Sequence, residues 1–319
     1  MPKFILPPPD PSIPGSSPPE NASPSTIPIA PSPWTLRAKS WTFLYTDPDP
    51  SEPLKTPPQN PNNTPEILQN VLPPGAYHPF EQIHPSALTS LPKEKSQFGD
   101  GKLWLKCVMI VRYEETDVGP YDELIFIPGR ATNPNNNKRD MRITTIYVST
   151  DASVWNGRRN WNIPKHRAIF DFKSVPGTKD IALRVFHPEG SPAPLDSKRP
   201  FFTALLRGSS LPKIPLPALA PLPITQPPLL PSRWPAGIQD ATIGTDDPEH
   251  GRQNPWLRIK PSFKGWWGVT YPGVLEEERE GGETLRYHGD GVGFPEVKLR
   301  SLGTYFEGVV EFGIADVVS

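Results

Sequence analysis

Short hydrophobic runs separated by turn-forming residues dominate the chain. The runs are rich in β-branched and aromatic residues, are bounded by Gly, Pro, Asn or Asp, and cover residues 40–46, 103–113, 123–129, 142–150, 167–172, 181–186 and 201–207. The pattern continues through residues 256–273, 296–302 and 304–318. Many short strands at close spacing are typical of sandwiches and barrels, so the sequence predicts a mainly β fold.

Helical signals are few. In the stretch "TDASVWNGRR", Thr150 or Asp151 is placed to cap a short helix, and Gly157 is a typical helix-ending residue. We therefore predict that a short helix ends near Gly157 and that helices decorate the sheet.

Prolines divide the chain. Of the 47 prolines, many lie in residues 1–33, which offer few backbone donors and little apolar bulk, so this segment is predicted to be an extended or disordered arm. Residues 34–319 are predicted to form one β domain with a proline-rich insert at 211–235. Leucines alternate with prolines in the insert, which favours a polyproline-II segment packed on an apolar surface over a ligand for an SH3-type domain.

Composition narrows the function classes. The formal net charge is −1, so no overall field favours nucleic acid or an anionic membrane surface, and we expect a small-molecule partner. No run of 18 apolar residues occurs, and the single cysteine, Cys107, has no internal disulfide partner; a cytoplasmic protein is the expectation. The histidines show no metal-binding spacing, so we expect neither a metal nor a cofactor.

One lysine stands in an unusual setting. In "GRRNWNIPKHRAIFDF", Pro164 fixes its own backbone and biases Ile163 toward an extended conformation, so Lys165 is predicted to begin a strand at a rigid point. Such a position suits a reactive amine, and it equally suits an ordinary surface lysine. The residues alone favour the second interpretation.

The same stretch resembles the acetoacetate decarboxylase family, in which a reactive lysine follows a Gly-Arg-x5-Pro segment. Here the segment runs from Gly157 and Arg158 to Pro164 and Lys165. Upstream, "GPYDELIFIPG" is similar to a Tyr-x-Glu strand of the family, and "SWTFLYTDP" followed by "VLPPG" is similar to its first strand and the next loop. The resemblance covers residues 35 to about 190. It implies an antiparallel β-barrel or cone with few short helices.

The resemblance also implies chemistry. Lys165 would form a Schiff base with a carbonyl compound such as a keto acid, Glu123 would carry protons, and decarboxylation or aldol and dehydration chemistry would follow. We expect a substrate-binding group at four further positions: Arg158, Trp161, Tyr121 and Tyr45.

Two positions depart from the family's pattern. His166 stands where the family has a second lysine, and Tyr45, Thr46 and Asp47 stand where its first strand carries an arginine. Neighbours on a strand point to opposite faces, so His166 is expected to face away from Lys165. A non-catalytic protein that binds an apolar small molecule in the same fold remains the alternative, and a homo-oligomer is left open.

Overall fold

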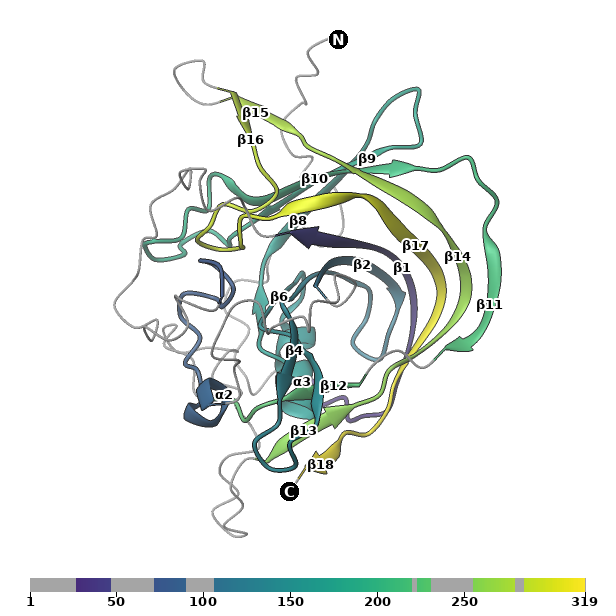
Figure 1. Ribbon diagram of the computed structural model, residues 1–319. Helices are drawn as coiled ribbons and strands as arrows, with labels where there is room; N and C mark the ends of the chain where they lie inside the picture. The colour runs from purple at the N-terminus through teal and green to yellow at the C-terminus, as the bar shows by residue number, and fades with distance from the viewer. Residues whose placement is uncertain are drawn as a thin grey trace.

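The computed structural model describes residues 27–46, 72–89, 106–219, 223–230, 255–278 and 284–318. Most of these residues form strands, and the helices among them are α2 (Pro85–Thr89) and α3 (Asp151–Trp161). The predicted fold class, a mainly β barrel-like architecture with few short helices, is confirmed (Figure 1). In this part of the chain, no helix has the length and apolar character needed to cross a membrane.

An 11-stranded sheet forms most of the wall, and its strands are antiparallel except for one parallel pair, β6 and β7. Along the sheet the order is β7 (Lys165–Arg167), β6 (Thr145–Val148), β3 (Tyr121–Ile127), β2 (Cys107–Glu115), β1 (Trp34–Thr46), β17 (Lys298–Phe312), β14 (Ser262–Gly273), β10 (Pro200–Gly208), β9 (Ile181–Phe186) and β8 (Ile169–Ser174), with β11 (Ile214–Leu219) paired to β14. Strand twist accumulates over so many strands, and the sheet curls into a nearly closed barrel (Figure 1).

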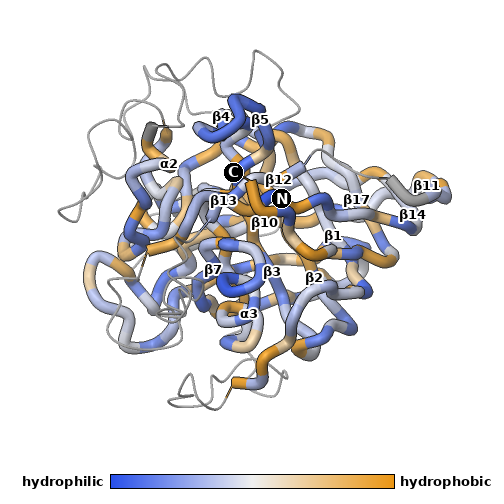
Figure 2. The backbone as a smooth tube through the Cα atoms, turned by 90° about the horizontal axis from the view of Figure 1, so that it is seen from below, coloured by the Kyte–Doolittle hydropathy of each residue, from blue (hydrophilic) through white to orange (hydrophobic). Residues whose placement is uncertain are grey.

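A second, five-stranded sheet lies beside α3. Its order is β18 (Asp316–Val318), β13 (Trp256–Ile259), β12 (Ile224–Gln226), β5 (Arg139–Arg142) and β4 (Gly129–Thr132). The β4–β5 hairpin is the hydrophilic end of this sheet in Figure 2. A separate hairpin pairs β15 (Glu276–Glu278) with β16 (Thr284–Arg286).

The main sheet buries apolar side chains on both faces. Along β1, Trp41, Phe43 and Tyr45 belong to one hydrophobic cluster, whereas Trp34 and Leu36 belong to the other. This separation follows from the period of two along a strand. The second cluster surrounds the cavity that is described below.

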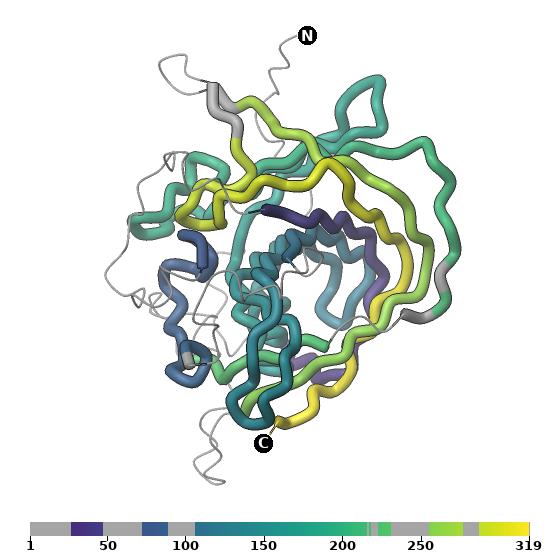
Figure 3. Tube along the Cα trace, in the orientation of Figure 1, coloured from purple at the N-terminus to yellow at the C-terminus, as the bar shows by residue number. Residues whose placement is uncertain are grey.

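The longest strands join distant parts of the sequence. β1 pairs with β17 over almost its whole length, from Trp34 opposite Phe312 to Thr46 opposite Lys298. Figure 3 shows this neighbourhood as a purple segment beside a yellow one. The centre of the barrel wall is thus made by the first and one of the last described strands.

The predicted strands correspond to observed ones, with shifted ends. The predicted run 181–186 is β9, whereas the run 142–150 is divided between the end of β5 and β6. The helix prediction was right about the start, because Thr150 caps α3, and wrong about the end, because α3 passes through Gly157 and ends at Trp161.

The proline-rich segments are partly described. Residues 1–26 of the predicted arm lie outside the described residues, whereas Ile27 is buried and Ala30 accepts a 2.8 Å hydrogen bond from Asn160 of α3. Within the predicted insert, β11 carries exposed side chains such as Ile214 at 58%, and Leu229 is buried. Residues 220–222 and 231–235 of the insert lie outside the described residues.

Candidate active site

A helical crossover places Lys165. The chain leaves β6, passes through α3 and returns as β7 parallel to β6, with Lys165 opposite Ile146. Asn162 ends α3 in a left-handed conformation with φ of 53°, and the following residues extend into β7. Lys165 therefore directly follows a helix end and a proline, at the predicted start of a strand.

Gly157 lies against the Lys165 side chain. A Cβ atom at position 157 would lie 2.6 Å from Lys165 Cδ and 2.7 Å from Cε, closer than side chains approach one another. The glycine is therefore required by this contact inside the helix, and α3 continues past it to Trp161.

The Lys165 amine lies in a polar cluster inside an apolar surrounding. Its Nζ donates to Glu123 Oε2 at 2.9 Å, to Ser153 Oγ at 3.0 Å and to the Tyr121 hydroxyl at 3.5 Å. Lys165 and Glu123 are each only 3% exposed. These two residues, which are separated by 42 positions in the sequence, are thus in direct contact.

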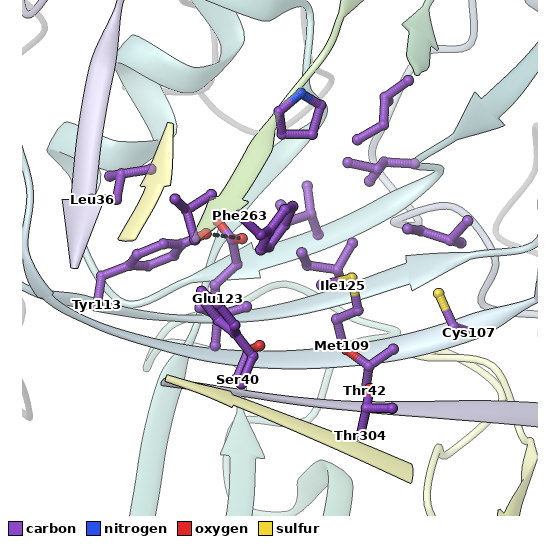
Figure 4. Close-up of a pocket in the computed structure, with 18 of the residues that line it drawn as sticks. Leu36, Ser40, Thr42, Cys107, Met109, Tyr113, Glu123, Ile125, Phe263 and Thr304 are labelled. Atoms are coloured by element: carbon purple, nitrogen blue, oxygen red, sulfur yellow. Dashed lines mark hydrogen bonds between the residues drawn. The ribbon is translucent and has the colours of Figure 1, made fainter. Parts of the chain in front are cut away.

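Two tyrosines complete the cluster around the carboxylate. Tyr113 donates from its hydroxyl to Glu123 Oε1 at 3.1 Å (Figure 4), and its ring lies 4.5 Å from that of Tyr121. Burial, and secondly the charge of Glu123, raises the pKa of both tyrosines well above the usual value. Both phenols therefore remain protonated and able to donate a hydrogen bond.

The cluster opens into a cavity of about 760 Å³ inside the curled sheet. β1, β2, β3, β14 and β17 supply most of the wall, with Trp161 and Ile163 at the end of α3. Figure 4 shows apolar side chains such as Met109, Ile125 and Phe263 around the space. Among the described lining residues, only Lys165 and Glu123 carry charge.

The predicted substrate-binding residues separate into two groups. Tyr121 and Trp161 line the cavity, and the Trp161 indole donates to Gly313 O at 2.9 Å. The structure does not bring Arg158 or Tyr45 to the cavity. Tyr45 points to the opposite face of β1 and packs against Phe126, with 5.1 Å between ring centroids.

Arg158 is held by a carboxylate on the far side of β7. Its guanidinium donates to both oxygens of Glu81, at 2.9 and 3.1 Å, and contacts Lys165 O at 3.4 Å. His166 Nε2 lies 2.7 Å from Glu81 Oε2, so His166 faces away from the Lys165 amine as strand alternation predicts. The arginine thus secures the backbone of β7 and does not reach the cavity.

Opposing effects set the protonation of Glu81 and of the histidines beside it. Burial alone raises the pKa of Glu81, but Arg158 and His166 together lower it to about 2. Burial lowers the pKa of His166, and it lowers that of His78, whose ring stacks on His166 at 3.7 Å. Glu81 is therefore ionised between Arg158 and a histidine pair. No group of three or more His, Cys, Asp or Glu side chains among the described residues is placed to hold a metal ion.

Sequence reasoning did not identify Ser153, Tyr113 or Glu81. Ser153 lies in the first turn of α3, where sequence reasoning assigned it no role. Tyr113 pairs with Tyr121 across β2 and β3, so correct strand register would have revealed it. Glu81 lies in an irregular loop with no periodic pattern, and no signal in the sequence connects it to Arg158.

Replacing Gly157 with alanine tests how closely the amine must be placed. The new methyl group would displace Lys165 Cδ and Cε. The initial rate at which a carbonyl probe and borohydride label the amine is therefore expected to fall on the order of 100-fold. Alanine stabilises a helix by about 1 kcal/mol relative to glycine, and crowding against Lys165 destabilises the fold by about 1 to 3 kcal/mol. The free energy of unfolding in urea should therefore change much less than the labelling rate. Gly313→Ala, where a Cβ meets no atom within 4 Å, is the matched control. Equal trapping rates in both variants would contradict the prediction.

Comparisons with known proteins find similarity only among solved structures. No protein-family model matches the sequence, and no curated protein matches it significantly. The chain is similar to the crystal structure of acetoacetate decarboxylase from Legionella pneumophila, with 12% identity, a TM-score of 0.47, and coverage of 91% of this chain and 88% of that one. A second structure from studies of acetoacetate decarboxylase gives 13% identity, a TM-score of 0.44, and coverage of 94% and 95%.

Proposed function

We propose that Lys165 forms a Schiff base with a carbonyl compound in the cavity and that the protein is a carbon–carbon lyase. The observation that carries the proposal is the buried Lys165 amine within 2.9 Å of the Glu123 carboxylate, at the wall of a cavity large enough for a substrate. The Gly-Arg-x5-Pro-Lys segment and the Tyr-x-Glu strand support placing the chain as a divergent relative of acetoacetate decarboxylases.

The first stage forms the imine. Glu123 takes a proton from Lys165, and the neutral amine attacks the carbonyl carbon, forming a carbon–nitrogen bond while the carbonyl oxygen takes up a proton. That oxygen leaves as water after a second protonation, and a protonated imine remains. Ser153 and Tyr121, at 3.0 and 3.5 Å from Nζ, orient the amine during the attack.

The second stage uses the imine as an electron sink. The bond between the α carbon and the β carbon of the substrate breaks, its electron pair forms the new double bond between the α carbon and the imine carbon, the pair of the imine double bond moves to the nitrogen, and an enamine results. Glu123 protonates the enamine carbon, and water hydrolyses the imine to release the product and the free amine. Decarboxylation and aldol cleavage follow this sequence. Dehydration uses the same electron sink differently: a base removes a proton from the carbon next to the imine, and hydroxide then leaves from the following carbon and is protonated to water.

A ligand-binding protein without catalysis is the second candidate. All three hydrogen atoms of the Lys165 ammonium can be used by Glu123, Ser153 and Tyr121, which is the arrangement expected of a structural ion pair. In that case the cavity would hold an apolar molecule without covalent attachment.

Borohydride trapping separates the two candidates. The protein is incubated with a panel of aldehydes and ketones, reduced with borohydride, digested and analysed by mass spectrometry. An adduct on the peptide that contains Lys165, formed faster than on exposed lysines such as Lys264, is the expected result. Adducts spread over surface lysines without preference for Lys165 would refute the Schiff-base mechanism.

Replacing Glu123 with glutamine is expected to slow trapping at Lys165 by about 100- to 10,000-fold, because the amide cannot accept the ammonium proton. Glutamine keeps the size of the side chain and can still contact Tyr113 and Lys165. The measurement is the initial rate of adduct formation against pH. Asp122→Asn, which alters the neighbouring residue whose partner is Arg112 at 2.9 Å outside the cluster, is the control. A rate equal to that of the control would exclude Glu123 as the proton carrier.

A further inference from the structure

The charge of the cavity wall limits the substrate. The described lining residues contain one cation, Lys165, and one anion, Glu123, and these two neutralise each other at 2.9 Å. Arg158, which was expected to bind the substrate and could pair with a carboxylate, is occupied by Glu81 behind β7. Among the described lining residues, a substrate carboxylate would find no free cationic partner, and burying it unpaired near Glu123 is unfavourable.

The volume of the cavity points in the same direction. About 760 Å³ falls within the range of sites that bind drug-sized molecules. The wall consists mainly of aliphatic and aromatic side chains, including Ile125, Phe263 and Phe306. A short keto acid would leave most of this apolar space unfilled, whereas a long apolar body would fill it.

Three neutral hydroxyl groups face the cavity away from the amine. Ser40 and Thr42 of β1 and Thr304 of β17 line it, and Thr42 lies opposite Thr304 in the sheet (Figure 4). None of these hydroxyls has a hydrogen-bond partner among the described residues. They are therefore available to an oxygen or nitrogen atom of a ligand.

Strand register places these hydroxyls relative to the reactive group. Glu123 lies opposite Val111 on β2, and Val111 lies opposite Ser40 on β1. Adjacent strands are about 4.8 Å apart, so Ser40 lies two strands, or about 10 Å, from Glu123 at the same level. Thr42 lies two residues, or about 7 Å, further along β1 than Ser40.

We propose that the cavity selects a neutral, largely apolar ketone or aldehyde that carries a second hydrogen-bonding oxygen about 10 Å from the reacting carbonyl, and not a keto acid. This inference rests on the proposed function, because Lys165 marks the position of the reacting carbonyl. The apolar body lies along β2 and β1, and the second oxygen meets Ser40, with Thr42 and Thr304 lying beyond it in the cavity.

The test uses three methyl ketones with the same chain length, spanning about 10 Å, that end in a hydroxyl, a methyl or a carboxylate group. Trapping at Lys165 is measured at subsaturating ketone in the parent protein. The hydroxyl ketone is expected to react fastest, and the carboxylate ketone at least tenfold more slowly. Equal or faster trapping of the carboxylate ketone would overturn the inference while leaving the Schiff-base mechanism intact.

A triple variant tests the hydroxyls directly. In Ser40→Ala/Thr42→Val/Thr304→Val, the hydroxyl ketone should lose its advantage over the methyl ketone, a change of about 2- to 10-fold for one hydrogen bond. Ser301 lies on β17, as Thr304 does, but its side chain is exposed and outside the cavity lining. The control variant Ser301→Ala should therefore leave the preference for the hydroxyl ketone unchanged. An unchanged preference in the triple variant would refute the role of the three hydroxyls.

Non-covalent binding separates this inference from the proposed function. In the double variant Lys165→Met/Glu123→Gln, no imine can form, and binding of the same three ketones is measured by calorimetry. If no ketone labels Lys165 in the parent but the hydroxyl ketone binds the double variant best, the ligand class stands and the lyase mechanism falls. Absence of both labelling and binding with all three ketones would overturn both proposals.

Discussion

Replacing Lys165 with methionine is expected to abolish borohydride-dependent labelling in the cavity, because no other described lining residue carries an amine. The remaining adducts should map to surface lysines and match the background of the parent protein. Mass spectrometry of the digested protein, with the hydroxyl and methyl ketones as probes, measures the loss. Lys264→Met removes an exposed lysine on β14 and should leave cavity labelling unchanged.

The same substitution should destabilise the protein. Without the ammonium, Glu123 stays buried with a hydrogen bond from Tyr113 but no counter-charge, and removal of one member of a buried ion pair costs about 3 to 5 kcal/mol. Adding Glu123→Gln removes the uncompensated charge and should recover most of the lost free energy of unfolding in urea titrations. A double variant no more stable than Lys165→Met would show that the pair is not energetically coupled.

Replacing Glu81 with glutamine is expected to lower the free energy of unfolding near neutral pH by about 3 to 5 kcal/mol, since Arg158 would remain buried without a counter-charge. Both side chains are almost completely inaccessible, so solvent screens the pair little. Urea denaturation followed by tryptophan fluorescence measures the loss. Asp316→Asn, which breaks an exposed pair with Lys260, should cost at most about 1 kcal/mol.

Acid should reveal the same ion pair in the parent protein. The pKa of Glu81 is lowered from 4.5 to about 2 in the folded state. The contribution of the ionised carboxylate to the free energy of unfolding is therefore complete above the unfolded pKa and is lost as the pH falls toward 2. This contribution should be absent from the pH dependence of Glu81→Gln over that window. Parallel stability curves for parent and variant between about pH 4.5 and about 2 would contradict the assignment.

The strands and the place of Lys165 at a strand start were predictable because they depend on local sequence. β-branched and aromatic runs indicated the sheet, and Pro164 indicated the start of the strand that begins at Lys165. Alternation then predicted correctly that His166 points away from the amine.

The failures arise where both faces of a strand are buried. Tyr45 and Thr42 lie on the same apolar strand, and one faces the hydrophobic cluster around Phe126 while the other faces the cavity. Hydrophobic alternation cannot distinguish two buried faces, so nothing local showed that Tyr45 was on the wrong one. The helix end predicted near Gly157 was wrong for another reason. The role of Gly157 depends on its contact with the Lys165 side chain, which forms only when the crossover folds.

The pairing of β1 with β17 has a consequence for synthesis on the ribosome. The paired residues Trp34 and Phe312 are 278 positions apart (312 minus 34). One edge of β1 therefore stays unpaired until nearly the whole described chain has been synthesised. Contacts of such separation form slowly, and an uncovered edge can pair with another chain in the meantime. Nascent chains that stop before residue 298 should therefore be aggregation-prone and depend on chaperones, whatever the stability of the finished barrel.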